Sequence, residues 1–201
     1  MSPGDQEAAC RLYLVSPPQV ALESFTAELA TALDAHDVAC FMLALNDQSD
    51  DVWRQTTKAL GPIAQSRDVA FVLLGHDYLV LDVEADGAHI EGSVEAGRAS
   101  LPDDRIVGAG CGSSRHDAMI AGEAGADYVA FGPPSPDAQA CLTWWQMMME
   151  PPCVALGCQS VQQAVAAAEA GADFVALNYE LWSDSASLAE IAAAVAKITG
   201  H

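Results

Sequence analysis

Short apolar runs recur along the chain, and each one ends at residues that favour turns. Such runs, bounded by Gly, Pro, Asp or Ser, are typical of buried β-strands. On this basis we expect eight strands, at residues 11–15, 38–43, 69–74, 87–90, 106–108, 128–132, 153–157 and 174–178. The longer stretches between them place apolar residues three and four positions apart, which predicts helices with one apolar face.

The helix expected near residues 160–171 has the clearest ends. Ser160 and Gln163 have the spacing of a capping box, in which the serine caps the helix and the glutamine reaches back. Gly171 follows the helix and can adopt the left-handed conformation that ends it. Gly125 has the same place before the strand expected at 128–132. Strands that alternate with helices in this way predict a parallel sheet.

Two twelve-residue stretches, 121–132 and 167–178, are identical at eight of twelve positions. Each contains a helix end, a glycine, an Ala-Asp turn and a short apolar strand. The copies lie 46 residues apart with one further strand between them, so one strand–helix unit takes roughly 23 residues. Eight units need about 184 residues, and eight is the number that closes a (β/α)8 barrel. We therefore predict an α/β protein with a single-domain (β/α)8 TIM barrel over residues 1–201.

An open, doubly wound sheet is the alternative for alternating strands and helices. Such a sheet usually has a Gly-rich loop after its first strand, but residues 15–18 read Val-Ser-Pro-Pro. The sequence contains neither Gly-x-Gly-x-x-Gly after a strand nor Gly-x-x-x-x-Gly-Lys-Ser/Thr. Nucleotide-binding α/β folds are therefore disfavoured.

The charge balance narrows the choice of partners. Twenty-eight acidic and eight basic residues give a formal net charge of −20, which disfavours nucleic acid and anionic membranes as partners. There is no apolar run of about 18 residues and no basic N-terminal segment before an apolar stretch, so we expect a cytoplasmic protein without a membrane span. Six scattered cysteines, none in a Cys-x-x-Cys pair, are expected to be reduced thiols.

Five segments in a fixed order carry a family resemblance: LYLV (12–15), ADGAHI (85–90), GADYVAFGP (125–133), VALG (154–157) and GADFVA (171–176). Each is a common barrel junction by itself, but the series resembles the thiamine-phosphate synthase family, including its thiazole tautomerase branch, over nearly the full length. The resemblance implies a reaction that joins hydroxymethylpyrimidine diphosphate to a thiazole phosphate, with Mg²⁺ and loss of pyrophosphate. A small phosphorylated metabolite is then the expected partner.

The resemblance also implies positions for the site. A phosphate would bind at the loops after the seventh and eighth strands, on backbone amides and a helix N-terminus, and the matching residues here are Gly157, Cys158, Gln159 and Asn178. Further rim candidates, each next to the C-terminal end of an expected strand, are Ser113, Gly132, Ser135 and His89. Glu91 and Glu95 are the carboxylates nearest the family's metal-binding aspartate, which makes them the candidate Mg²⁺ ligands; no other cofactor is expected.

Several family motifs are absent. The Gln-x-Arg-x-Lys segment that grips diphosphate is replaced by residues 43–47, which contain no cation, and the Asn-Asp pair is replaced by Leu74-Gly75. Ser-Thr-His is replaced by residues 110–112, and no Thr-x-x-Lys occurs in residues 132–137. Loss of a diphosphate leaving group requires charge neutralisation, so these changes predict a degenerate active site.

Three functions therefore remain open from the sequence: a thiamine-phosphate synthase-like transferase, a thiazole tautomerase-like isomerase, and a non-catalytic phosphate-ligand-binding or regulatory barrel. A homodimer is also expected. Trp144, Trp145 and residues 147–149 make an apolar segment denser than one helix face can bury, so part of it is expected at a dimer surface.

Overall fold

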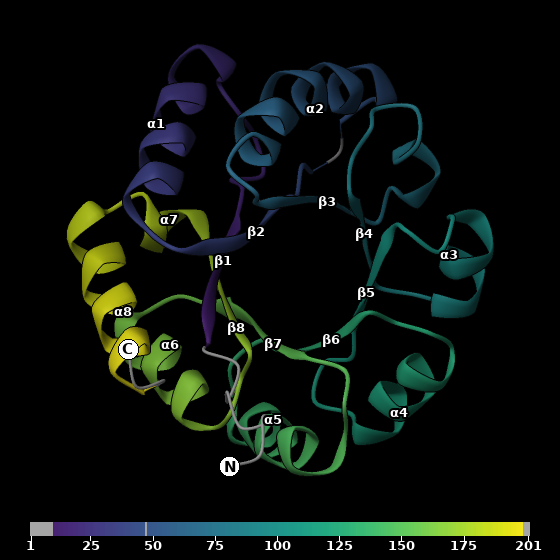
Figure 1. The fold of residues 1–201 in the computed structure, drawn as a ribbon, viewed down its shortest axis with the longest axis vertical. Helices are drawn as coiled ribbons and strands as arrows, with labels where there is room; N and C mark the ends of the chain where they lie inside the picture. Colours follow the sequence, from purple (N-terminus) through teal and green to yellow (C-terminus); the bar gives the residue numbers. More distant parts are fainter. Residues whose placement is uncertain (1–9, 47, 199–201) are drawn as a thin grey trace, which may run out of the picture.

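The computed structural model describes residues 10–46 and 48–198, and eight parallel strands within them close into a barrel. The strands follow one another around the ring in chain order, and β8 pairs with β1 (Figure 1). They are β1 (Arg11–Val15), β2 (Val38–Leu43), β3 (Ala70–Leu74), β4 (Gly87–Ile90), β5 (Ile106–Gly110), β6 (Tyr128–Phe131), β7 (Cys153–Cys158) and β8 (Phe174–Leu177). The predicted (β/α)8 barrel is confirmed, with strand ends that differ by at most two residues from those expected.

A ring of helices surrounds the strands (Figure 1). The helices are α1 (Leu22–Ala35), α2 (Asp50–Gln65), α3 (Val94–Ser100), α4 (Arg115–Glu123), α5 (Pro136–Met148), α6 (Val161–Glu169), α7 (Tyr179–Trp182) and α8 (Ser185–Ile198). The expectation of a helix after every strand is wrong at one place, because a single 3₁₀ turn, η1 (Asp77–Leu79), is the only helical element between β3 and β4. The connection between these strands is too short for a full helix with loops at both ends. No helix in the described part of the chain is long and apolar enough to cross a membrane.

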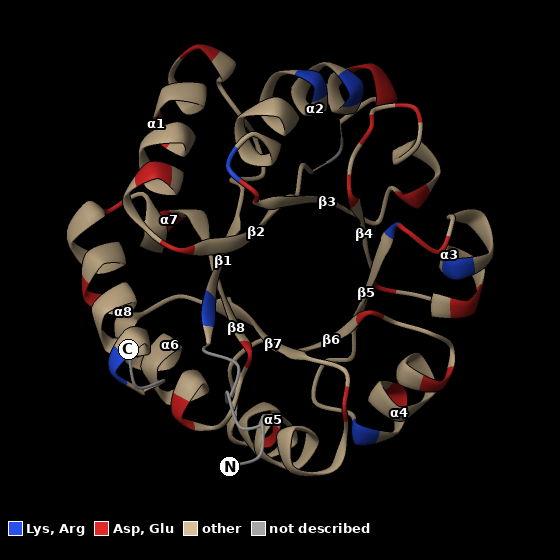
Figure 2. Ribbon diagram, viewed as in Figure 1, with Lys and Arg blue, Asp and Glu red and all other residues tan. Residues whose placement is uncertain are grey.

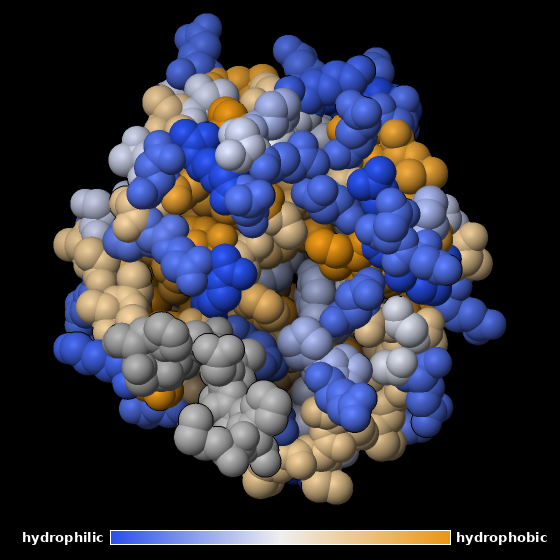
Figure 3. Space-filling model, viewed as in Figure 1, coloured by the Kyte–Doolittle hydropathy of each residue, from blue (hydrophilic) through white to orange (hydrophobic). Residues whose placement is uncertain are grey.

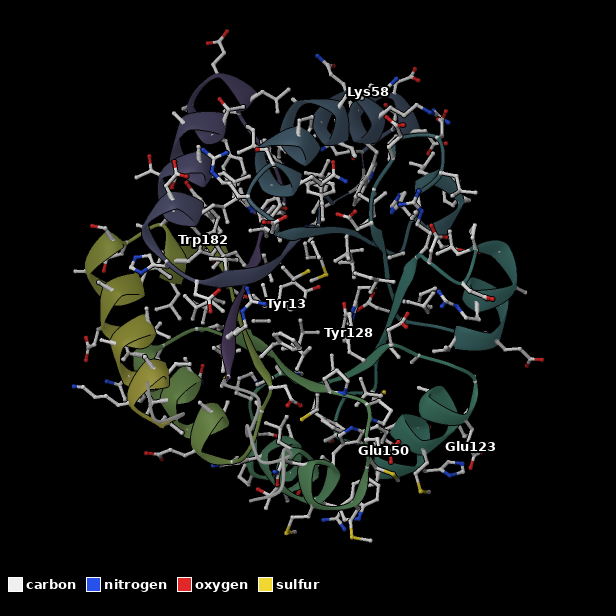
Figure 4. The ribbon with its side chains drawn as sticks, viewed as in Figure 1. Tyr13, Lys58, Glu123, Tyr128, Glu150 and Trp182 are labelled. Atoms are coloured by element: carbon white, nitrogen blue, oxygen red, sulfur yellow. The ribbon has the colours of Figure 1, made fainter. Side chains whose placement is uncertain are left out.

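The barrel interior has its own small core, separate from the larger one between strands and helices. Successive strand residues face opposite sides, so every second residue points inward. The buried inward residues of this core are Tyr13, Cys40, Met42, Val72, Tyr128, Ala130, Val154 and Ala176. Tyr13 and Tyr128 point toward one another inside the ring (Figure 4). Gly108 makes room for this arrangement, because a Cβ there would lie 1.9 Å from Cζ of Tyr128.

Three aspartates hold the N-terminal end of the barrel together. Each precedes an even-numbered strand and binds one residue of the preceding odd-numbered strand at two points. The carboxylate accepts that residue's backbone N–H at 2.7 Å, and the aspartate's own N–H donates to the same residue's carbonyl at 2.8 to 3.0 Å. We call these contacts the aspartate clamps. They are Asp86 with Phe71, Asp127 with Val107, and Asp173 with Cys153.

The clamps give a structural reason for the repeated Ala-Asp motif, since Asp127 and Asp173 are the aspartates of the two copies. The corresponding residue before β2 is Asp37, but its carboxylate binds the guanidinium of Arg11, at 2.7 Å, in place of a backbone N–H. Hydrogen bonds to charged groups contribute about 1.5–3 kcal/mol each. The repeat therefore marks residues that stabilise the barrel.

The opposite end of the barrel is organised by serines. The N-cap serine of each helix from α2 to α6 accepts a backbone N–H from the residue three positions later, at 3.1 to 3.5 Å. These serines are Ser49, Ser93, Ser114, Ser135 and Ser160. Their helices begin where the strands end, so the positive ends of the helix dipoles surround this mouth. Backbone partial charge is thus the recurring electropositive feature of this end.

Candidate functional site

The barrel mouth has an apolar floor. Val15, Leu74 and Leu156 lie near the C-terminal ends of their strands, pack against the interior core, and are only partly buried. Gly110 is exposed at the end of β5, and Gly132 is partly buried just after β6. Of these two glycines, Gly110 is the exposed position without a side chain beside the floor.

The residues predicted to bind phosphate lie at the ends of β7 and β8 and in the loops that follow them. Gln159 and Asn178 line the same cavity, of about 390 Å³, together with Glu180 and Leu181. Gly157 has φ +83°, a left-handed conformation that favours glycine. The structure thus brings two of the predicted residues together, but it also places the carboxylate-bearing Glu180 on the same cavity.

Cys158, the fourth predicted phosphate-binding residue, has its side chain in the outer core. Its sulfur lies 3.9 Å from the carbonyl oxygen of Ala155, and burial raises the pKa of the thiol to about 12. A neutral buried thiol offers nothing to an anion, so any contribution of Cys158 to phosphate binding is limited to its backbone.

The start of α6 differs in detail from the predicted capping box. Ser160 caps the helix as expected, but Oε1 of Gln163 accepts the N–H of Gln159, at 2.9 Å, and not that of Ser160. The N–H of Gln159 is therefore already paired within the protein. A phosphate at this corner must compete with the Gln163 side chain for it.

Two of the rim candidates have structural roles. The hydroxyl of Ser135 is occupied as the cap of α5. Gly132 lies where β6 and β7 approach closely, because a Cβ there would be 2.1 Å from the carbonyl oxygen of Leu156. Ser113 is exposed at the rim, and its neighbour Ser114 is the residue that caps α4. Of these candidates, Ser113 has the free rim position that the prediction gave it.

Glu91 and Glu95 are both exposed and line one cavity of about 300 Å³, which also borders Gly110 and Asp117. Within residues 10–46 and 48–198, no three or more His, Cys, Asp or Glu side chains are placed to hold a metal ion. Mg²⁺ is usually held by one or two carboxylates plus substrate phosphates. Glu91 and Glu95 give this cavity that number of carboxylates, and a Mg²⁺ site here stays a prediction.

His89 was predicted at the rim, and the structure places it in the barrel interior. Its side chain is completely buried, and Nδ1 lies 3.0 Å from the hydroxyl of Tyr128, which in turn lies 3.0 Å from the hydroxyl of Tyr13. Burial lowers the pKa of His89 from 6.5 to about 4, so the imidazole is neutral at pH 7. Its Nε2 has no hydrogen-bond partner in the structure.

Sequence reasoning missed the two tyrosines of this interior chain. The available signal was their inward position on strands β1 and β6, because a buried tyrosine hydroxyl needs a hydrogen-bond partner. A second feature missed is an apolar cavity of about 240 Å³ between the loop after β6 and α6, bordered by Phe131, Leu142 and Ala167. The proline-rich loop at 132–136 was the signal for it.

Two arginines near helix starts at this end of the barrel are paired with neighbouring side chains. Arg54, near the start of α2, lies 2.6 Å from Asp82, and the guanidinium of Arg115, at the start of α4, stacks on Trp144 of α5 at 5.1 Å. Among the described residues, no lysine or arginine borders the three cavities named above. Basic segments lie mainly on helices or at strand starts in Figure 2, and hydrophilic residues cover much of the face viewed in Figure 3. In the cation-free segment 43–47, Asp47 lies outside the described residues.

The aromatic segment of α5 divides into buried and exposed parts. Trp145 is buried against Phe131 and donates its indole N–H to the carbonyl of Pro151. Met147 and Met148 are exposed. A dimer surface at this segment stays a prediction, and these two methionines are the side chains available for it.

The fold is a (β/α)8 barrel, a class whose enzymes carry their active sites at the C-terminal end of the strands. The model of the thiamine monophosphate synthase family matches residues 12–181, and the chain belongs to this family. The thiamine-phosphate synthase of Rhodospirillum centenum is 43% identical over 189 residues, which are 88% of this chain and 91% of the relative. That of Hyphomonas neptunium is 37% identical over 190 residues, 86% of each chain.

The solved structure of thiamine phosphate pyrophosphorylase from Pyrococcus furiosus is also similar. It has a TM-score of 0.82 and 20% identity, and the match covers 98% of this chain and 100% of that one. At this level of identity the likeness supports the fold alone.

Proposed function

We propose that this chain binds the phosphorylated precursors of thiamine phosphate at the barrel mouth and acts as a thiamine-phosphate synthase with slow turnover. Membership of the family and the names of the two relatives support this assignment. The observation that carries it is the meeting of Gln159 and Asn178, from different loops, at one cavity where the family resemblance expects phosphate.

In this proposal, the phosphate of the thiazole lies between Gln159 and Asn178, near the N-terminal end of α6. Helix N-termini favour anions through free N–H groups and the helix dipole. The apolar floor of Val15, Leu74 and Leu156 would receive the rings. The reaction then forms a C–N bond to the thiazole while the C–O bond to the diphosphate breaks, and pyrophosphate leaves with the electron pair.

Slow turnover follows from the charge of the mouth. Negative charge develops on the leaving diphosphate, and removal of one stabilising donor typically costs about 10²–10³ in kcat. The three cavities named above have no bordering lysine or arginine among the described residues. We therefore expect a kcat at least about 100-fold below that of a family member with the cationic motifs.

Binding without turnover is the second candidate function, and the same observation favours it. Backbone amides can hold a monophosphate without side-chain cations, whereas ionisation of a diphosphate needs charge neutralisation. Calorimetry shows whether the chain binds these ligands at all, and an activity assay then separates synthesis from binding alone. Thiamine phosphate and thiazole phosphate are titrated with Mg²⁺ into the full chain, and a discontinuous assay follows thiamine phosphate formation from the two precursors.

We expect heat from both phosphorylated ligands and measurable but slow product formation. Heat without product leaves the binding function alone, and no heat with any ligand contradicts both. Asn178→Ala and Gln159→Ala should each weaken thiamine phosphate binding about tenfold, the loss of about one hydrogen bond to a charged group. Gln162→Ala, an exposed residue of the same helix region, is the matched control and should leave affinity unchanged.

A further inference from the structure

We propose that Nε2 of His89 is a ligand contact at the floor of the barrel mouth, where it donates a hydrogen bond to a ring nitrogen of the pyrimidine of a bound ligand. This inference rests on the proposed function for the identity of the ligand. The side chain is completely buried, yet this one nitrogen has no partner in the structure. An unpaired buried polar atom costs about 1–3 kcal/mol, so its retention needs an explanation.

Gly110 shows which way Nε2 faces. The position that a Cβ of Gly110 would take lies 3.2 Å from Nε2, with the carbonyl oxygen of Ile90 at 3.6 Å and Cγ of Glu91 at 3.8 Å. Gly110 is itself exposed at the end of β5. The unpaired nitrogen therefore lies beside a residue without a side chain at the exposed end of β5.

The tyrosine pair determines whether Nε2 donates or accepts. Tyr13 lies between the thiol of Cys40 and the hydroxyl of Tyr128, and Tyr128 lies between Tyr13 and Nδ1 of His89. If Tyr13 donates to Tyr128 and Tyr128 donates to Nδ1, both hydroxyl protons reach strong acceptors. The opposite direction would leave the Tyr13 proton on sulfur, which is a weak acceptor. The first direction is therefore favoured, and it puts the ring proton of His89 on Nε2.

The N–H donor at this position suits the pyrimidine part of the ligand, while the phosphate binds elsewhere. A ring N–H donor pairs with an acceptor of the ligand, and the ring nitrogens of a pyrimidine are such acceptors. Gln159 and Asn178 line a different cavity from the one that borders Gly110. One ligand would thus be held at two chemically distinct places.

Nuclear magnetic resonance of the intact chain with ¹⁵N-labelled histidine tests the contact without a substitution. At pH 7 we expect the ring proton of His89 on Nε2, and a shift of the Nε2 resonance when thiamine phosphate or hydroxymethylpyrimidine is added. Thiazole phosphate alone should leave this resonance unchanged. If thiamine phosphate binds by calorimetry and Nε2 does not respond, the contact is overturned while the proposed function stands; if no ligand binds, both are overturned.

Two substitutions give a second measurement. His89→Phe removes the donor, and Gly110→Ala places a methyl group against Nε2 at a position where the backbone conformation is ordinary. Each should weaken thiamine phosphate binding about tenfold, and His89→Gln, which keeps an N–H donor, should recover part of the loss. The controls His116→Phe, at an exposed histidine, and Gly61→Ala, in α2, should bind as the parent does. Unchanged affinity in folded His89→Phe overturns the contact.

Discussion

The two ends of the barrel use recurring residues for different purposes. At the N-terminal end, Asp86, Asp127 and Asp173 clamp neighbouring strands through paired backbone contacts. At the C-terminal end, serines cap five helices, and the remaining rim residues differ from one loop to the next. The clamps need the same residue at each place because they make the same contact. A mouth that binds one asymmetric ligand needs a different residue at each place.

This difference explains why the repeated motif identifies the fold and not the reaction. Barrel enzymes place their chemistry on the loops at the C-terminal ends of the strands, while conservation at the other end reflects stability. The repeat of residues 121–132 and 167–178 is strongest around its clamp aspartates. The two copies diverge at their ends, where Gly132 and Asn178 enter the mouth. Three predictions test whether stability and ligand binding are separated in this way.

The largest expected effect is at the N-terminal end. Asp127→Ala leaves the N–H of Val107 without its carboxylate partner and removes a contact to Arg98, so we expect the free energy of unfolding to fall by about 3 kcal/mol. Denaturant unfolding measures this change, and Asp103→Ala, at an exposed aspartate outside the clamps, is the control. Affinity for thiamine phosphate should not change. A large loss of affinity in folded Asp127→Ala would contradict the separation of the two ends.

An intermediate effect is expected from the interior between the two ends. His89 has a pKa of about 4 when folded and 6.5 as its ordinary value, so the unfolded chain binds more protons between these pH values. Its stabilising contribution is present above pH 6.5 and is lost as the pH falls toward 4. We expect about 2 kcal/mol of unfolding free energy to be lost between pH 6.5 and 4.5.

The same measurement on His89→Gln is the control, because protonation of carboxylates affects both proteins in this range. The difference between the two pH profiles isolates the imidazole, whose Nδ1 contacts the hydroxyl of Tyr128. Identical profiles for the two proteins would contradict the neutral, buried state of His89.

The smallest effect is expected at the mouth. Ser114 caps α4 through the N–H of Asp117, at 3.1 Å, and Ser114→Ala should lower the free energy of unfolding by about 1 kcal/mol. Ser113→Ala changes the neighbouring exposed serine, which is not the cap, and should change stability by less than about 0.5 kcal/mol. Thermal unfolding of the pair checks this; equal losses would show that the cap is not the source of the effect.

Much of the fold could be predicted because it depends on local patterns. Alternating apolar runs located all eight strands, and Gly125 and Gly171 end helices in the left-handed conformation expected of them. The absence of an α-helix between β3 and β4 could not be predicted in this way. Residues 75–86 have the apolar residues of a helical turn, and only the short length of the segment argues against a longer helix. Strand ends were least well placed, since hydrogen bonds to neighbouring strands determine them.

The site was predicted less completely. The family resemblance named Gln159 and Asn178, and these two residues line one cavity, because the loops after adjacent parallel strands meet at one end of the barrel. The sequence placed Cys158 in the same phosphate site, but the side chain of this residue faces the outer core. It gave no account of Glu180, which shares the cavity. Which side of a strand a residue faces changes with a shift of one position, and β7 and β8 have an irregular register at this place.

The sequence by itself determined the barrel, because helix and strand periodicity and the repeated Ala-Asp junction are local features that recur along the chain. Only the tertiary structure decided what fills the interior. Tyr13 and Tyr128 are 115 residues apart, and His89 is 39 residues from Tyr128. The hydroxyl of Tyr128 nevertheless lies 3.0 Å from the hydroxyl of Tyr13 and 3.0 Å from Nδ1 of His89. Closure of the barrel and the register of its strands bring them together, and neither is written in any one segment.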